Sequence, residues 1–125
     1  MRTLRLLSIL AVLLLVTPAT AQDSFKTGAN AYNSGFFGSA ARHWLDLAER
    51  GHGPAQYNIG RMHYYGQGVV RDRIEAYKWF LIAGENGVER SHAAARILGD
   101  RMTSREVAEA TLRARDWNGR RSNRQ

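Results

Sequence analysis

Two segments that each carry a tryptophan among regularly spaced alanines constrain the fold of this chain more than any other feature. They read "AARHWLDLAERG" (residues 40–51) and "EAYKWFLIAGENG" (residues 75–87). Overlaying them aligns three pairs of residues that lie 35 positions apart: Ala41 with Ala76, Trp44 with Trp79, and Ala48 with Ala83. Because a period of about 34 residues marks repeats built of two helices, the sequence predicts helical hairpins that stack side by side.

Signals for helix starts and stops predict an all-α chain. Apolar residues recur at helical spacing, and no stretch alternates convincingly with the period of two that a strand requires. In "MTSREV", Thr103 is expected to cap a helix and Glu106 to complete a capping box, as Asp72 and Glu75 are for an earlier helix. The predicted helices start at Asp23 or Ser24, Ser39, Pro54, Asp72, about Arg90 and Thr103, and the last one runs to about Trp117.

The inward faces of these helices follow from the same periodicity. Leu45 is expected to point inward with Trp44, Ile97 with Leu98, and His63 with Met62. The helices are expected to stop at glycines such as Gly51, Gly66 and Gly87.

The connection "GQGVVRD" (residues 66–72) has two interpretations, a phosphate-binding loop or the turn of a helical hairpin. A nucleotide-binding loop would need a preceding strand and a longer glycine pattern. Here the preceding segment is helical and no third glycine follows, so the turn is favoured. Gly66 and Gly68 allow backbone angles that other residues resist.

Residues 55–87 resemble a Sel-one-like (Sel1-like) repeat, a relative of the tetratricopeptide repeat. Residues 24–51 look like a shorter, degenerate unit, and residues 90–117 are similar to the terminal helix pair of short bacterial members. The resemblance implies a short α-solenoid of antiparallel helix pairs with a C-terminal capping helix. The positions that carry the match are Ala55, Gly60, Gly66, Gly68, Val69, Asp72, Ala76, Trp79, Ala83 and Gly87.

The sequence predicts no catalytic, metal or cofactor site. The four histidines, at 43, 52, 63 and 92, are never three or four residues apart, so no helix face offers a metal pair. The chain has no cysteine, and its serines stand where caps and turns need them. We therefore expect a protein that is not an enzyme and needs no cofactor.

A polar, tyrosine-bearing surface is the candidate binding site. The resemblance implies that the first helix of each pair lines a concave groove, and Tyr and Arg are the residue types that carry interface energy. The alternative for the tyrosines is packing against neighbouring helices. The predicted partner-binding residues are Tyr57, Arg61, Tyr64 and Tyr65 of the full repeat, with Lys26, Asn30 and Asn33 of the first unit.

The two ends of the chain carry further expectations. Arg2 and Arg5, an apolar run from Leu6 to Val16, and Ala19-Thr20-Ala21 have the pattern of a signal peptide (residues 1–21) cut after Ala21. The helical-repeat domain is then expected at residues 22–117, in a periplasmic or secreted protein, bacterial by its resemblance. A basic tail follows at residues 118–125, read either as a disordered, solubilising end or as a segment drawn to an anionic surface.

These observations predict an exported adaptor or scaffold that binds a protein or an extended peptide in its groove. The alternative is a peripheral binder of an anionic membrane or cell-wall surface through the Arg-rich tail. Nucleic acid is a poor partner for an exported protein, despite a net charge of +7. With few repeats the groove is short, and homodimerisation that lengthens it is left open.

Overall fold

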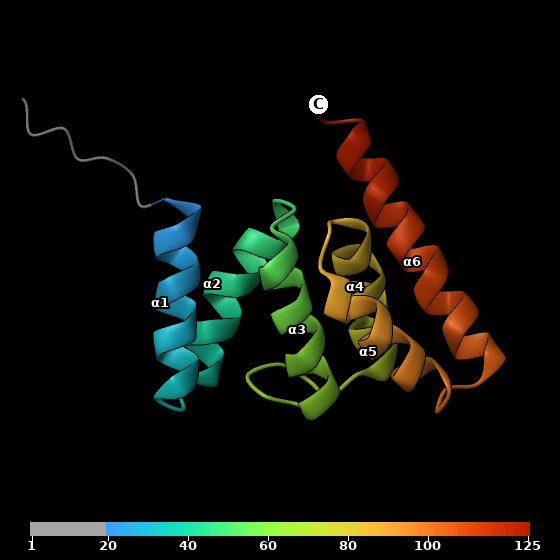
Figure 1. Cartoon of the computed structure of the whole chain (residues 1–125), viewed down its shortest axis with the longest axis horizontal. Helices are drawn as coiled ribbons and strands as arrows, with labels where there is room; N and C mark the ends of the chain where they lie inside the picture. Colours follow the sequence, from blue (N-terminus) through green and yellow to red (C-terminus); the bar gives the residue numbers. More distant parts are fainter. Residues whose placement is uncertain (1–19) are drawn as a thin grey trace, which may run out of the picture.

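The computed structural model describes residues 20–125, which form a row of six α-helices (Figure 1). Within this range there is no strand, so the prediction of an all-α fold is confirmed. The predicted signal peptide lies almost wholly outside the described residues, and none of the described helices is long and apolar enough to cross a membrane. The helices are α1 (Ala21–Asn33), α2 (Phe37–Glu49), α3 (Gly53–Tyr65), α4 (Arg73–Glu85), α5 (Glu89–Gly99) and α6 (Ser104–Ser122).

Two helix starts lie where the caps were predicted. The side chain of Thr103 accepts from the backbone N–H of Glu106 at 3.2 Å, and the Glu106 carboxylate accepts from the Thr103 N–H at 2.9 Å. Asp72 caps α4 by accepting from the N–H groups of Ile74 and Glu75. Glu75 does not complete that second box, because its carboxylate pairs with Lys78 and with Arg113 of α6.

Two other starts were predicted too late. α1 begins at Ala21, since Thr20 forms a full capping box with Asp23. α2 begins at Phe37 with Phe36 as an N-cap that makes no side-chain hydrogen bond, so Ser39 lies inside the helix. The turn before α2 is tight because Gly35 takes φ 81°. α2 therefore begins two residues before Ser39, the residue that was predicted to cap it.

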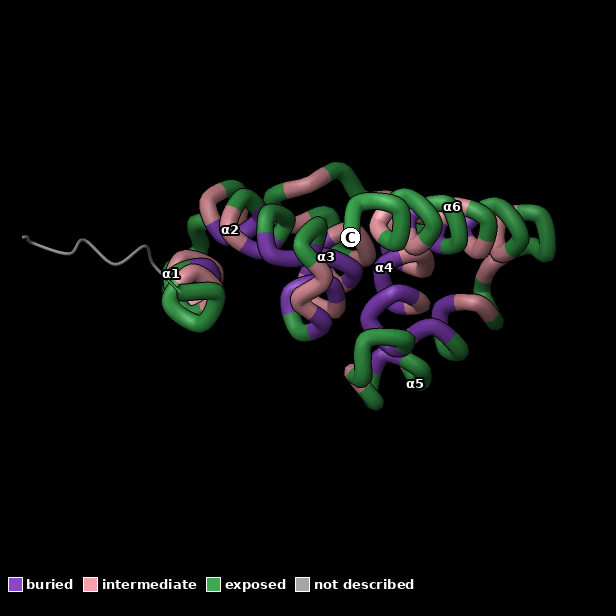
Figure 2. Tube along the Cα trace, turned by 90° about the horizontal axis from the view of Figure 1, so that it is seen from above, coloured by how far each residue is buried: buried purple, intermediate pink, exposed green. Residues whose placement is uncertain are grey.

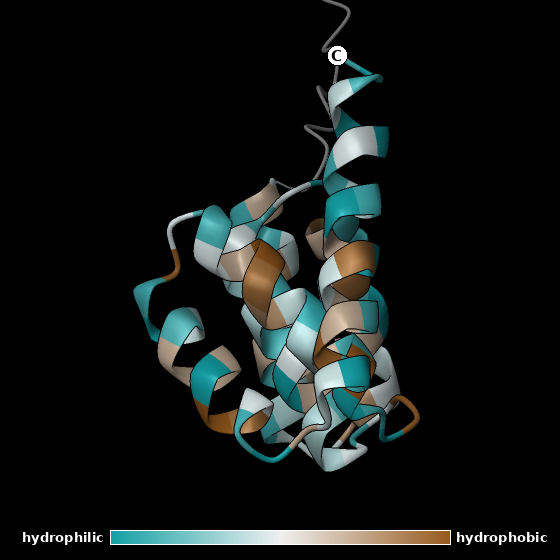
Figure 3. Ribbon diagram, turned by 90° about the vertical axis from the view of Figure 1, so that its right-hand side faces the viewer, coloured by the Kyte–Doolittle hydropathy of each residue, from teal (hydrophilic) through white to brown (hydrophobic). Residues whose placement is uncertain are grey.

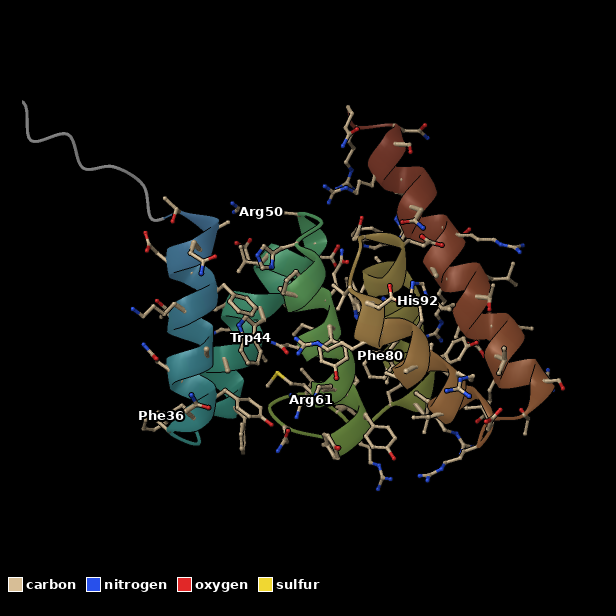
Figure 4. All side chains as sticks on the ribbon, in the orientation of Figure 1. Phe36, Trp44, Arg50, Arg61, Phe80 and His92 are labelled. Atoms are coloured by element: carbon tan, nitrogen blue, oxygen red, sulfur yellow. The ribbon has the colours of Figure 1, made fainter. Side chains whose placement is uncertain are left out.

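In each of the first two hairpins, a glycine of the first helix packs against an aromatic ring of the second helix. A Cβ atom at Gly28 of α1 would lie 2.5 Å from Trp44 Nε1 of α2. A Cβ atom at Gly60 of α3 would lie 2.7 Å from Phe80 of α4. The indole N–H of Trp44 also donates to the carbonyl of Phe25 at 3.1 Å, and Figure 4 shows Trp44 beside α1. The glycines let the two helices of a hairpin approach closely.

This packing corrects the internal alignment by one residue. The Phe25–Trp44 rings, 5.9 Å apart, correspond to the Tyr57–Phe80 rings at 5.7 Å. Trp44 is therefore equivalent to Phe80, 36 positions on, and not to Trp79. Trp79 turns to the other side of α4 and meets Trp117 of α6 edge to face at 5.8 Å. The overlay at 35 positions was wrong because α2 carries alanine at both 40 and 41, so Ala76 has a matching alanine in either register.

α5 and α6 do not pack against each other as a third hairpin. α4 packs against both helices, whereas α5 and α6 make little contact with each other. Figure 2 shows them on opposite sides of α4. The helix starts place Arg96 of α5 where α3 has Gly60. A long charged side chain in place of the glycine prevents the close approach, so α6 lies along α4 as a cap.

The core runs through the row as one large cluster and one smaller one. The large cluster holds Trp44, Ile59, Trp79 and Trp117, and the smaller one joins Phe80 to α5. Figure 2 shows buried segments in each helix from α2 to α5. Two residues predicted to point inward do not: Leu45 is 40% exposed and Ile97 is 54% exposed. Both lie at the edge of their helix's buried stripe, where only the neighbouring helices decide what is covered.

The C-terminal segment also departs from the prediction. α6 continues to Ser122, five residues beyond the predicted end at Trp117. Arg121 is half-buried and stacks over the Trp117 ring at 5.5 Å. Most of the predicted basic tail is thus part of a helix, whose upper turns are mainly hydrophilic (Figure 3). The stacked arginine and the tryptophan hold this last stretch in place.

Candidate peptide-binding hollow

A hollow of about 210 Å³ lies between α3 and α5, and we call it the aromatic hollow. It brings together all four residues predicted on α3 and adds one residue of α4 and three of α5. Figure 4 shows Arg61 on the lower half of α3, with Phe80 on α4 beside it. The lining residues are Tyr57, Arg61, Tyr64, Tyr65, Phe80, Ala94, Ile97 and Leu98.

The three residues predicted on α1 lie elsewhere. Lys26, Asn30 and Asn33 are exposed on α1 and line none of the hollow. The row places α2 against both α1 and α3, while α1 and α3 make little contact with each other. The first helices of the first two units therefore do not form one continuous stripe.

The tyrosines divide between packing and exposure. Tyr57 is half-buried against Phe80, so part of its ring serves packing. Tyr65 is 57% exposed and meets Tyr64 edge to face at 4.9 Å. The exposed part of the hollow is thus made by Tyr65 and by Ile97 across from it.

Guanidinium groups surround these rings. The Arg90 guanidinium lies 4.3 Å from the centre of the Tyr57 ring. Arg61 lies 6.0 Å from the centres of both Tyr57 and Tyr65. Arg101 donates to the hydroxyl of Tyr64 at 3.3 Å. Cations over aromatic faces are attracted by the ring quadrupole, so the arginines are oriented by the tyrosines.

A second hollow of about 380 Å³ continues the first one toward the α3–α4 turn. It shares Tyr64 and Leu98 with the aromatic hollow and adds Arg71, Arg73 and Arg101. Arg73 pairs with Glu106 at 2.7 Å. The two hollows together form an aromatic and aliphatic surface bordered by arginines.

The predicted binding residues included none of this surface outside α3, and Arg90, Ile97 and Arg101 are the omissions that matter most for binding. The missed signal is the 36-residue offset between the starts of α3 and α5. At that offset Arg61 corresponds to Ile97, and Tyr65 to Arg101. Applying the repeat period to the third unit would have found both.

The titratable groups whose pKa values are shifted all lie outside the aromatic hollow. Burial lowers the pKa of His52, which caps α3 by accepting from the Ala55 N–H. Burial alone would raise the pKa of Glu75, but Lys78 and Arg113 outweigh it and hold that pKa below its usual value. The lining of the hollow offers aromatic, aliphatic and guanidinium groups, which suit contact with a partner.

The histidines serve local structure. His63 bonds through Nδ1 to the Val70 carbonyl at 3.0 Å and so holds the α3–α4 turn. His92 lies over Gly84, where a Cβ atom would meet its ring. Among residues 20–125, no three His, Cys, Asp or Glu side chains cluster closely enough to hold a metal.

Fold and surface together define a short α-solenoid of paired helices with an open contact face, the architecture of a helical-repeat scaffold. Residues 53–88 match the Sel1 repeat family. The chain also superposes on the crystal structure of a protective antigen of uropathogenic Escherichia coli strains that displays an SLR fold. The TM-score is 0.73 and the identity 28%, over 79% of this chain and 22% of that one. The chain therefore contains a Sel1 repeat and has the fold of Sel1-like repeat proteins.

Two curated relatives share the repeat region, and both are named exopolysaccharide production negative regulator. The one from Rhizobium meliloti (strain 1021) is 35% identical over 65 residues, which are 52% of this chain and 24% of the relative. The one from Rhizobium leguminosarum bv. viciae is 34% identical over 67 residues, which are 54% and 25%. This chain therefore spans about a quarter of the length of these relatives.

Proposed function

We propose that this protein is an exported interaction module that holds a segment of a partner protein in the aromatic hollow. The observation that carries the proposal is the exposure of Ile97 and Tyr65 over a floor that includes Phe80 and Leu98. Exposed apolar side chains gathered in a concave site, with Tyr and Arg around them, have the composition of an interface centre. The proposal assigns no reaction to the protein.

Affinity capture from the envelope fraction of the source organism tests this function. The bait carries Ile97→Asp and Tyr65→Ala, which place a charge in the hollow and remove its most exposed ring. The matched control is Leu112→Asp, because Leu112 is 58% exposed on α6 and lines none of the hollow. A partner held in the hollow is lost with the first bait and kept with the control. Equal capture by both baits contradicts the proposal.

Export is part of the proposal and rests on the N-terminal sequence. Cleavage after Ala21 would leave Gln22 as the first residue and would remove Thr20, the cap of α1. We expect an intact mass of the envelope-derived protein that corresponds to Gln22–Gln125. Recovery of the uncut chain from the cytoplasmic fraction contradicts export.

A second candidate function is attachment to an anionic surface, favoured by a hollow of about 300 Å³ at the end of α6. Lys78, Arg120, Arg121 and Arg124 line it, with Glu49 as the acidic side chain. We expect cosedimentation with phosphatidylglycerol vesicles to weaken in Arg120→Gln/Arg124→Gln and to persist in Arg105→Gln/Arg115→Gln. We use point substitutions because deletion of residues 118–125 would also remove the end of α6. Equal sedimentation of both variants contradicts this candidate.

Homodimerisation that lengthens the groove is an alternative that the sequence leaves open. Sedimentation equilibrium of the purified chain tests it, and a monomer at high protein concentration contradicts it.

A further inference from the structure

The size of the aromatic hollow limits what it can hold. Its volume of about 210 Å³ is below the range of about 300–1,000 Å³ in which small-molecule sites fall. The apolar part of its lining comes from Phe80, Ala94, Ile97 and Leu98. The aromatic hollow by itself therefore suits one large apolar side chain, and its continuation of about 380 Å³ leaves room for the residues that flank that side chain.

The charged side chains that line the two hollows are all arginines, and of these only Arg73 is paired, with Glu106. Arg61 lines the hollow, Arg71 and Arg101 line its continuation, and Arg90 covers the Tyr57 ring. No Asp or Glu lines either hollow, including Glu89 and Asp100, which neighbour Arg90 and Arg101 in sequence. Of the ion pairs formed within residues 20–125, none involves these four arginines. No ion pair within the described residues therefore occupies these four guanidinium groups.

The arginines stand at both ends of the hollow. Arg90 lies against Tyr57, and Arg101 bonds to Tyr64, seven residues further along α3. That separation is about 10 Å along a helix that rises about 1.5 Å per residue. Because the rings already orient these guanidinium groups, little conformational freedom is lost when they bind a carboxylate. A ligand with acidic groups on both sides of an apolar one would meet both ends.

From these observations we infer that the aromatic hollow binds an acidic peptide segment, in which one leucine or larger apolar side chain is flanked on both sides by Asp or Glu. The apolar side chain enters between Tyr65 and Ile97. The carboxylates on its two sides pair with Arg90 at one end and with Arg101 and Arg71 at the other. This inference rests on the proposed function and adds the chemistry of the partner.

Fluorescence anisotropy of three labelled peptides tests the inference with the full chain. The first peptide has leucine between aspartates and glutamates, in the second asparagine and glutamine replace the acids, and in the third alanine replaces leucine. We expect the first to bind about tenfold or more tightly than either of the others, because one loses the charge pairs and the other the buried side chain. Its affinity also falls as salt rises.

Two double variants locate the site. The Arg90→Gln/Arg101→Gln variant is expected to bind the first peptide about tenfold more weakly and to bind the second peptide with unchanged affinity. Arg42→Gln/Arg115→Gln lowers the net charge equally on exposed parts of α2 and α6 and leaves binding unchanged. Amide NMR shifts induced by the first peptide are expected at Tyr65, Ala94 and Ile97.

The results of these experiments can overturn the inference about an acidic peptide without overturning the proposed function. Equal binding of the acidic and neutral peptides overturns the inference, while capture of a partner that depends on Ile97 and Tyr65 would still support the function. Binding of none of the three peptides, or shifts elsewhere on the molecule, also overturns it. Competition by single-stranded DNA that does not depend on the leucine points to a general polyanion site and overturns the peptide assignment.

Discussion

At the scale of single residues, this fold depends on glycines that face aromatic rings. Gly60 is buried, and its missing side chain leaves room for Phe80 of the paired helix. The same arrangement joins Gly28 to Trp44. Glycine in the interior of a helix normally lowers the stability of the helix by about 1 kcal/mol relative to alanine. Here the close packing that the glycine permits outweighs this loss.

Gly60→Val is expected to destabilise the protein by about 1–3 kcal/mol, the usual cost of overpacking a filled site. The added Cβ would lie 2.7 Å from Phe80 and 3.3 Å from the Ala76 carbonyl, so the two helices must move apart. The control is Gly119→Ala, where a Cβ meets nothing within 4 Å, and which is expected to stabilise α6 by about 0.5–1 kcal/mol. Urea unfolding measures both changes, and an unchanged midpoint for Gly60→Val contradicts the packing argument.

Ser91→Ala is expected to raise stability by about 1 kcal/mol, because a buried hydroxyl without a partner costs its desolvation. Ser91 is fully buried and its Oγ makes no hydrogen bond. The equivalent residue of α3, 36 positions earlier, is the fully buried Ala55. Thermal unfolding measures the change. A loss of stability would mean that the hydroxyl has a partner, such as a bound water.

The cap of α3 predicts a pH dependence of stability. His52 accepts the Ala55 N–H through Nδ1 only as neutral imidazole, and burial places its folded-state pKa below the unfolded value of 6.5. Its contribution is therefore complete above pH 6.5 and is lost as the pH falls through the folded-state pKa. His52→Asn keeps a capping side chain and should remove this part of the dependence. An identical profile for both proteins in urea unfolding from pH 8 to pH 5 contradicts the prediction.

At the scale of elements, α6 is held by one face of α4. Trp79 and Trp117 meet edge to face, and the Trp117 indole N–H donates to Glu49 of α2 at 2.9 Å. The Arg113–Glu75 pair joins the same two helices at 2.7 Å. Because α6 makes little contact with α5 and lines none of the aromatic hollow, we expect the hollow to keep its lining when α6 detaches.

Trp117→Ala is expected to cost about 3–5 kcal/mol, the usual loss for a buried tryptophan. Hydrogen exchange should show the loss first in α6, while Ile59 and Met62 of α3 keep more of their protection. Trp117→Phe, which retains a ring but not the bond to Glu49, should cost less. A uniform loss of protection along the whole chain would contradict an independently docked α6.

At the scale of the whole molecule, the six helices form a row in which the main contacts join close neighbours. Such a chain behaves as a series of coupled units more than as a single globule. Within the row, the fully buried side chain of Gln56 couples three consecutive helices. It donates to the Ala48 carbonyl at 3.0 Å and accepts from Asn86 at 2.9 Å, so it ties α2, α3 and the end of α4 together.

Gly28→Val is expected to open the α1 end of the row and to leave the opposite end folded. The Cβ atom would collide with Trp44, which separates α1 from α2. Hydrogen exchange should accelerate in α1 and α2 and change much less in α4–α6, because local stability follows local contacts. Equal acceleration in all helices would show that the row unfolds as one unit.

Features that depend on neighbouring residues in the sequence could be predicted, whereas features that depend on contacts between helices could not. Thr103 with Glu106, and Gly66 with its φ of 70°, are local signals, and the helices they bound were predicted within a few residues. Tyr57, Arg61, Tyr64 and Tyr65 follow one stretch of helix, so their shared hollow was within reach of the sequence. Arg90 and Ile97 come from another helix, and their place beside those tyrosines depends on packing.

The sequence by itself determined that this protein is a set of helices with repeat spacing, because capping, helical periodicity and glycine stops act over a few neighbouring residues. Only the tertiary structure decided three things: that Phe80 and not Trp79 is the residue equivalent to Trp44 in the second hairpin, that α6 lies along α4, and that α5 completes the aromatic hollow. The physical reason is that side chains from separate helices compete for the same space. The outcome depends on which side chains fit together once the helices pack. Gly60 of α3 leaves room for Phe80, whereas Arg96 at the corresponding position of α5 leaves no such room.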